Sequence, residues 1–135
     1  MENCIFCKIV HGEIPCHKIY ENEKILAFLD INPITRGHTL IIPKKHATDL
    51  IEMNEEDASQ IIMAAKKIAP ALLKAVNASG INLLNSNGKE AGQVVFHYHL
   101  HLIPRQSDDG VRLFTPTRKH DGDLTEVGES IRKQL

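Results

Sequence analysis

A run of alternating histidines constrains this chain more than any other feature. The segment reads Phe96-His97-Tyr98-His99-Leu100-His101-Leu102-Ile103-Pro104. Alternation of polar with apolar or aromatic residues is typical of a β-strand, and we expect one over residues 94–104. Every second side chain of a strand points to the same face, so the three histidines would form one row with neighbours about 6.5–7 Å apart. The other face would place Phe96, Tyr98, Leu100 and Leu102 in a core.

Hydrophobic patterning predicts the remaining elements. A short helix capped by Asn3 should end at Gly12, and strands are expected over residues 17–20, 24–30, 38–43 and 81–85. A long helix is predicted from Asn54 to Val76, which Pro70 should kink or restart, and a last helix over residues 123–134. Strands joined in hairpins, with the helices set apart, predict an α+β domain built on an antiparallel sheet.

Length and composition narrow the class of protein. The 135 residues fit a single domain spanning 1–135, with a patterned core at about 3–105 and a polar tail over 106–135. A net charge of −1 argues against nucleic acid as a partner. No apolar stretch approaches the roughly 20 residues that cross a membrane, so no membrane partner is expected. With no leader pattern and only three cysteines, we expect a cytoplasmic protein.

The histidine row allows two kinds of chemistry. Neutral imidazole binds metals, and it also attacks electrophiles such as phosphorus. His97, His99 and His101 could therefore hold a catalytic zinc. Alternatively, one of them is a nucleophile that the other two support. The residues alone leave both interpretations open.

A second candidate site is the Cys4-x-x-Cys7 pair, whose spacing is that of half a zinc site. No second cysteine pair exists, so the other ligands would be histidines or acids. A redox pair is less favoured because no βαβ unit precedes the motif. Two buried structural cysteines are the remaining alternative.

The combined motifs resemble those of the histidine triad (HIT) family of nucleotide hydrolases and transferases. The triad fits His-φ-His-φ-His-φ-φ, where φ is apolar, and its Ile103-Pro104-Arg105 ending is similar to the bacterial branch. The likeness also includes Cys4-Ile-Phe-Cys-Lys-Ile-Val, Gly12-Glu-Ile-Pro, Ala27-Phe-Leu-Asp-Ile, Gly37-His-Thr-Leu-Ile-Ile-Pro-Lys-Lys-His and Gly92-Gln-Val-Val-Phe-His. It implies a five-stranded antiparallel sheet with a long helix, paired into a homodimer.

The resemblance implies chemistry at the α-phosphorus of a nucleotide. His99 would attack through Nε2 and form a nucleotidyl-histidine intermediate, from which water releases a nucleoside monophosphate. His101 would contact the phosphate and assist the leaving group, while His97 and His38 support them. The substrates implied are adenosine phosphoramidates or dinucleoside polyphosphates. A nucleotide-binding sensor or interaction module with little turnover is the alternative function.

The resemblance also assigns a nucleotide site and a metal. Asp30 would accept both ribose hydroxyls, and the other implied contacts are Phe6, Phe28, Ile31, Asn85, Gly92, Gln93, Val94, His99 and His101. Val94 stands where the phosphoramidase branch often has serine, which leaves the preferred leaving group open. The resemblance implies one zinc ion per chain, held by Cys4, Cys7, His46 and His97. Because four protein ligands leave no open coordination position, this zinc would be structural.

Overall fold

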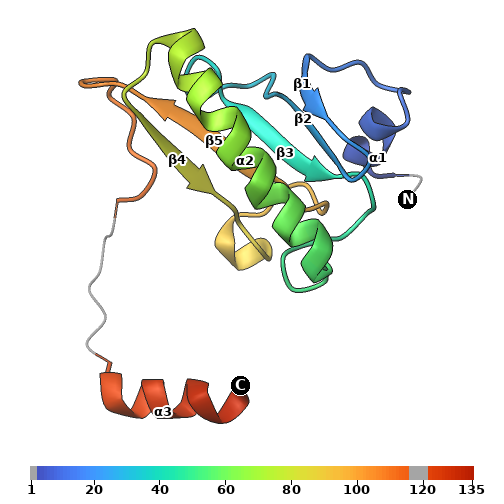
Figure 1. The fold of residues 1–135 in the computed structure, drawn as a ribbon. Helices are drawn as coiled ribbons and strands as arrows, with labels where there is room; N and C mark the ends of the chain where they lie inside the picture. Colours follow the sequence, from blue (N-terminus) through green and yellow to red (C-terminus); the bar gives the residue numbers. More distant parts are fainter. Residues whose placement is uncertain (1–2, 116–121) are drawn as a thin grey trace.

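The computed structural model describes residues 3–115 and 122–135. Its centre is a five-stranded antiparallel sheet in the order β1-β2-β3-β5-β4 (Figure 1). The strands are β1 (Lys18–Glu21), β2 (Ile25–Leu29), β3 (Thr39–Pro43), β4 (Gly80–Leu84) and β5 (Leu100–Arg105). The predicted α+β class and the antiparallel sheet are therefore confirmed.

The long helix α2 (Glu55–Val76) covers one face of the sheet (Figure 1). Asn54 caps it by accepting from the N–H of Asp57, and three acids fill the first turn, where the helix dipole favours negative charge. Its apolar stripe packs on every second residue of the central strands, such as Ile25, Ala27 and Ile41. This contact forms the main core.

The helix continues through Pro70, so the prediction that it restarts there is wrong. Pro70 is exposed, and it lies on the side of α2 that faces water rather than the sheet. The main-chain carbonyl of Lys66, which loses its partner to the proline ring, can therefore bind water instead. The core face of the helix is left intact.

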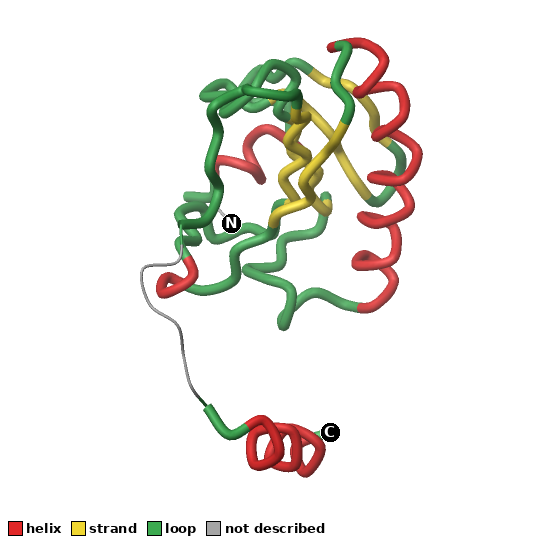
Figure 2. Tube along the Cα trace, turned by 90° about the vertical axis from the view of Figure 1, so that its left-hand side faces the viewer, coloured by secondary structure: helices red, strands yellow, loops and turns green. Residues whose placement is uncertain are grey.

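The short helix α1 (Ile5–Val10) lies on the opposite side of the sheet from α2 (Figure 2). Its N-cap is Cys4, whose Sγ accepts from the N–H of Cys7 at 3.3 Å, and not Asn3 as predicted. Phe6 packs here in a second, smaller core whose strand members are Leu26, Phe28, Leu40 and Ile42. Strands β2 and β3 are thus covered on both faces.

The predicted histidine strand is largely wrong. Only residues from Leu100 onward join the sheet, where they form β5. The segment before them consists of the short 3-10 helix η1 (Lys89–Ala91) and then an irregular loop. In that loop the N–H of Tyr98 bonds to the carbonyl of Ala47 at 2.7 Å instead of to a neighbouring strand. Tyr98, Leu100 and Leu102 are buried as expected, but Phe96 is half exposed.

The last helix, α3 (Leu124–Gln134), is confirmed, with Asp123 as its cap. None of its residues is buried, and it lies apart from the sheet and its helices (Figure 1).

Before the tail, Arg105 binds both carboxylate oxygens of Asp109 at 2.7 and 2.9 Å. No helix in the described ranges has the length and apolarity that a membrane crossing requires.

Candidate functional site

A cavity of about 390 Å³ opens between α1 and the sheet. That volume is in the range of small-ligand pockets. Its walls combine apolar side chains from three segments of the chain with the polar groups Asp30, His99 and His101. The apolar lining includes Ile5, Phe6, Ile9, Phe28, Ile31, Leu40, Val94 and Val95.

One ring nitrogen of His99 is fixed by the main chain. His99 Nδ1 lies 2.7 Å from the carbonyl oxygen of His97. A carbonyl only accepts, so Nδ1 carries the proton of the neutral ring and Nε2 has a free lone pair. The side chain of Asn85 donates to the carbonyl of His99 at 3.0 Å and holds the same residue from its main chain. Of the two ring nitrogens of His99, Nδ1 is therefore held by a hydrogen bond, whereas Nε2 is unprotonated and is not held by one.

His101 is fixed in the opposite tautomer. The N–H of Ile34 donates to His38 Nδ1 at 3.0 Å, which places the proton of neutral His38 on Nε2. That Nε2 lies 2.8 Å from His101 Nδ1 and donates to it. His101 Nδ1 is then an acceptor, so its own proton is on Nε2. This series of hydrogen bonds from Ile34 ends in an N–H donor on His101, whose ring centroid lies 5.0 Å from that of His99.

Burial keeps these imidazoles neutral. It lowers the pKa of His101 to about 4, with further lowering from His99 and His38, and it lowers the pKa of His99 and of His38. The nearby carboxylate of Asp30, 3.6 Å from His38 Nε2, opposes the shift in all three. Neutral imidazole is the nucleophilic form, so the free lone pair on His99 persists at neutral pH.

The structure places the other predicted nucleotide contacts in two groups. Phe6, Phe28, Asp30, Ile31 and Val94 line the cavity, with Ile31 and Val94 mostly exposed. Asn85 and Gln93 are engaged within the protein. The amide of Gln93 donates to the carbonyls of Thr48 and Val95 and accepts from Gly88, so this side chain shapes the loop. Gly92 has a φ of 90°, a conformation that glycine adopts readily.

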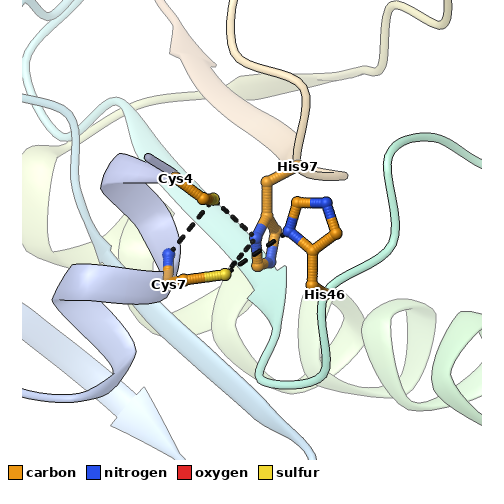
Figure 3. A group of neighbouring side chains, drawn as sticks. All are labelled: Cys4, Cys7, His46 and His97. Atoms are coloured by element: carbon orange, nitrogen blue, oxygen red, sulfur yellow. Dashed lines mark hydrogen bonds between the residues drawn. The ribbon is translucent and has the colours of Figure 1, made fainter. Parts of the chain in front are cut away.

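Cys4, Cys7, His46 and His97 converge beside helix α1 (Figure 3). Their ligand atoms all lie within 4.8 Å of one another. His97 Nδ1 lies 3.3 Å from Cys4 Sγ and 3.6 Å from Cys7 Sγ, and His46 Nδ1 lies 3.4 Å from Cys7 Sγ. Tetrahedral zinc separates bound sulfur and nitrogen by roughly 3.5 Å, given its ordinary bond lengths. These three separations are therefore close to those of a tetrahedral zinc site.

The tautomer of His97 supports the same conclusion. Its Nε2 lies 2.8 Å from the carbonyl oxygen of Pro43, so Nε2 carries the proton and Nδ1 presents its lone pair to the two sulfurs. His97 is completely buried, and this burial lowers its pKa to about 4, which keeps the ring neutral. These four residues could hold a metal ion.

A catalytic zinc on the triad does not fit this arrangement. In the described part of the chain, the ring nitrogens of His97, His99 and His101 do not converge on one point. Asp30, His38 and His101 do come together, but His38 Nε2 and His101 Nδ1 lie 2.8 Å apart in a hydrogen bond, closer than the roughly 3.3 Å that separates two nitrogens on one tetrahedral zinc. The alternating histidines thus serve two separate sites.

Comparison with known proteins decides the family. The sequence model of the HIT domain matches residues 11–108. The chain belongs to the HIT family. The Protein hit of Bacillus subtilis is 49% identical over 99% of this chain and 95% of its own length. The crystal structure of a Bacillus anthracis HIT family protein superposes with a TM-score of 0.91, at 46% identity, over 99% of this chain and 98% of that one.

Other relatives of this HIT protein carry functional names. Adenosine 5'-monophosphoramidase hnt1 of Schizosaccharomyces pombe is 44% identical over 79% of this chain and 77% of its own length. Adenylylsulfatase HINT3 of Arabidopsis thaliana is 39% identical over 98% of this chain and 70% of its own. A Zn-bound histidine triad protein from Mycobacterium smegmatis is 40% identical with a TM-score of 0.79, over 98% and 92% of the two chains.

Sequence reasoning missed the main-chain partners of the site. The carbonyls of Pro43 and His97 and the N–H of Ile34 set the tautomers of three histidines. Every residue has a main-chain carbonyl and every residue except proline has an N–H, so no sequence signal marks the ones used here. The cavity is also lined by Ile5, Ile9 and Cys16. The sequence signal that could have indicated them is their position within or after the Cys4-x-x-Cys7 motif.

Proposed function

We propose that this HIT protein is a nucleotide hydrolase that acts at the α-phosphorus through a covalent nucleotidyl-His99 intermediate. One observation carries the proposal. The cavity contains an imidazole with a free Nε2 lone pair beside an imidazole fixed as an Nε2–H donor. Relatives named as a phosphoramidase and an adenylylsulfatase support the hydrolase class. The substrates proposed are adenosine phosphoramidates or dinucleoside polyphosphates.

In the first step, His99 Nε2 forms a bond to phosphorus as the bond to the leaving group breaks. The ring becomes cationic, and the carbonyl of His97 stabilises it by accepting from Nδ1. His101 Nε2 donates to the leaving atom. An amine leaves as the free base after its nitrogen has taken a proton from solvent, and the water that attacks in the second step releases a proton to solvent as the bond from phosphorus to His99 Nε2 breaks, so the protein ends unchanged. A polyphosphate leaves as an anion and needs only the hydrogen bond.

The apolar walls and Asp30 suit a nucleoside. Phe6, Phe28 and Ile31 would pack against the base, while the free carboxylate oxygen of Asp30 would accept from the ribose. Asp30 is oriented for this by the N–H of Asn32, which donates to its other oxygen at 2.8 Å. A purine nucleoside monophosphate is therefore the proposed product.

The test is a covalent-intermediate experiment with His99→Ala. The natural protein, mixed briefly with an adenosine phosphoramidate, should gain the mass of one adenylyl group on the peptide that contains His99, and should release AMP. His99→Ala should show neither, whereas His17→Ala, which changes an exposed histidine outside the cavity, should behave like the natural protein. Full turnover by His99→Ala would overturn the mechanism. AMP binding without turnover of phosphoramidates or polyphosphates would instead favour the sensor function.

We also propose that the metal is zinc and that the single-domain chain works as a cytoplasmic homodimer. The fit of the cluster to tetrahedral zinc supports the first point. Exposed Ile62 and Met63 on α2 offer apolar surface for the second. Metal analysis should find one zinc per chain, lost in Cys4→Ala and retained in His99→Ala. Light scattering on the eluting protein should give twice the chain mass.

A further inference from the structure

Helix α1 links the metal cluster to the nucleotide cavity. Cys4 and Cys7 contribute two of the four metal ligands, and Phe6 between them lines the cavity. The family match begins at residue 11, after this helix. One wall of the cavity is therefore built by a segment outside the matched HIT domain, which also carries half of the metal site.

Phe6 is in direct contact with the nucleophile. Its ring is 7% exposed and packs edge-to-face against His99, with centroids 5.2 Å apart. The same ring packs against His97 at 5.9 Å and Phe28 at 5.7 Å. Such contacts restrict the rotation of the His99 ring about its side-chain bonds. The ring of His99 is thus held in two ways: it packs against Phe6, and its Nδ1 donates a hydrogen bond to the carbonyl of His97.

Helix α1 has little to hold it in place besides these groups. It has only six residues, and isolated helices of that length do not persist in water. In residues 3–115, its main-chain hydrogen bonds stay within the segment from Cys4 to Ile14 and do not reach the sheet. Its attachment comes from the packing of Phe6 and its apolar neighbours and from the cysteines facing His46 and His97.

We propose that the metal held by Cys4, Cys7, His46 and His97 positions Phe6 against His99, so that metal and nucleotide bind cooperatively. The metal joins α1 to the sheet, and the joined helix completes the wall against which the nucleotide binds. Coupling of this kind is reciprocal: the metal strengthens nucleotide binding by the same factor by which the nucleotide strengthens metal binding. The inference rests on the proposed nucleotide site.

Two binding measurements test it. Calorimetry should show AMP binding about tenfold more weakly to chelated protein than to zinc-loaded protein, a factor within the usual range of coupling between sites. In the second measurement, a chromogenic chelator takes zinc from the loaded protein, and saturating AMP should slow zinc release. This second readout starts from the intact zinc-loaded protein and does not depend on the stability of the zinc-free form.

Variants at Phe6 separate positioning from general packing. Phe6→Ala should retain one zinc per chain, yet AMP should no longer slow zinc release, and Phe6→Leu should recover part of the effect because it refills the space. Phe114→Ala is the matched control: this phenylalanine is exposed and belongs neither to the cavity lining nor to the metal cluster, so the coupling should persist. Persistence of the full coupling in Phe6→Ala would overturn the role of Phe6.

The outcomes distinguish this inference from the proposed function. Equal AMP affinity with and without zinc, or zinc release that AMP does not change, would overturn the coupling and leave the hydrolase proposal standing. Failure of zinc-loaded protein to bind AMP at all would overturn both. Tighter binding with zinc, together with slower zinc release, supports the coupling.

Discussion

His38 Nε2 donates a hydrogen bond to His101 Nδ1 across 2.8 Å, and that contact decides which nitrogen of His101 faces the cavity with a proton. The relationship joins the start of β3 to β5, neighbouring strands in the sheet. His38 is 2% exposed, and its other nitrogen is occupied by the N–H of Ile34. These hydrogen bonds place the proton of His101 on Nε2, so that this nitrogen is a hydrogen-bond donor. His38 acts on the cavity through His101.

This donor should matter most when the leaving group is a poor one. We expect His101→Ala to lower kcat/KM for an alkylamine phosphoramidate of AMP by about 10²–10³-fold, the usual cost of removing a positioned hydrogen-bond donor. With p-nitrophenyl-AMP the loss should be much smaller, because nitrophenolate is a stable anion that needs little help to depart. His38→Ala should show the same dependence with a smaller effect. Equal losses for both substrates would contradict a hydrogen bond from His101 to the leaving group.

The pH profile should reflect the buried imidazoles. An ordinary imidazole takes its proton near pH 6.5, whereas burial lowers the pKa of His38 and lowers that of His101 to about 4. His101 therefore stays neutral at pH 6, and kcat/KM should stay near its plateau there and decline only at lower pH. Stopped assays from pH 4 to 8, with zinc content measured in each sample, check this. An acid limb centred at pH 6.5 or above would contradict it.

Gly37, which precedes His38, should tolerate substitution poorly. Its φ is 89°, and an added Cβ would lie 2.8 Å from Cγ1 of Val76 and 3.0 Å from Cδ1 of Leu72 on α2. Gly12 has a similar φ of 77° but open space around it, which makes Gly12→Ala a matched control. We expect Gly12→Ala to cost about 1–2 kcal/mol of unfolding free energy, and Gly37→Ala about 2–5 kcal/mol. Urea unfolding measures both, and equal costs would show that α2 simply moves aside.

Pro70 offers a stabilising substitution. Pro70→Ala would restore a main-chain N–H to the carbonyl of Lys66 in a helix that is already continuous. Proline inside a helix costs roughly 3 kcal/mol relative to alanine, and proline also stiffens the unfolded chain, so the net gain should be about 1–3 kcal/mol. A higher urea midpoint with an unchanged slope would confirm it. A lower midpoint would show that the ring of Pro70 makes a stabilising contact.

Local patterning accounts for most of the fold. The short apolar runs of β2 and β3 and the capped, amphipathic α2 were readable because each signal depends only on neighbours along the chain. The strand prediction failed at Val94–His99, where Tyr98 pairs with Ala47 and the amide of Gln93 bonds to Thr48. Both partners lie about 50 residues earlier, outside any local pattern.

The sequence by itself determined the chemical groups of this HIT protein: three histidines at alternate positions and a Cys-x-x-Cys pair. The residue pattern alone did not distinguish the three histidines, and only the resemblance to the HIT family implied different roles for them. The tertiary structure decided that His97 faces the cysteines while His99 and His101 face the cavity. The physical reason is that a ring's tautomer follows its hydrogen-bond partner, and the partners of His97 and His101 lie far along the chain, at the carbonyl of Pro43 and the ring of His38.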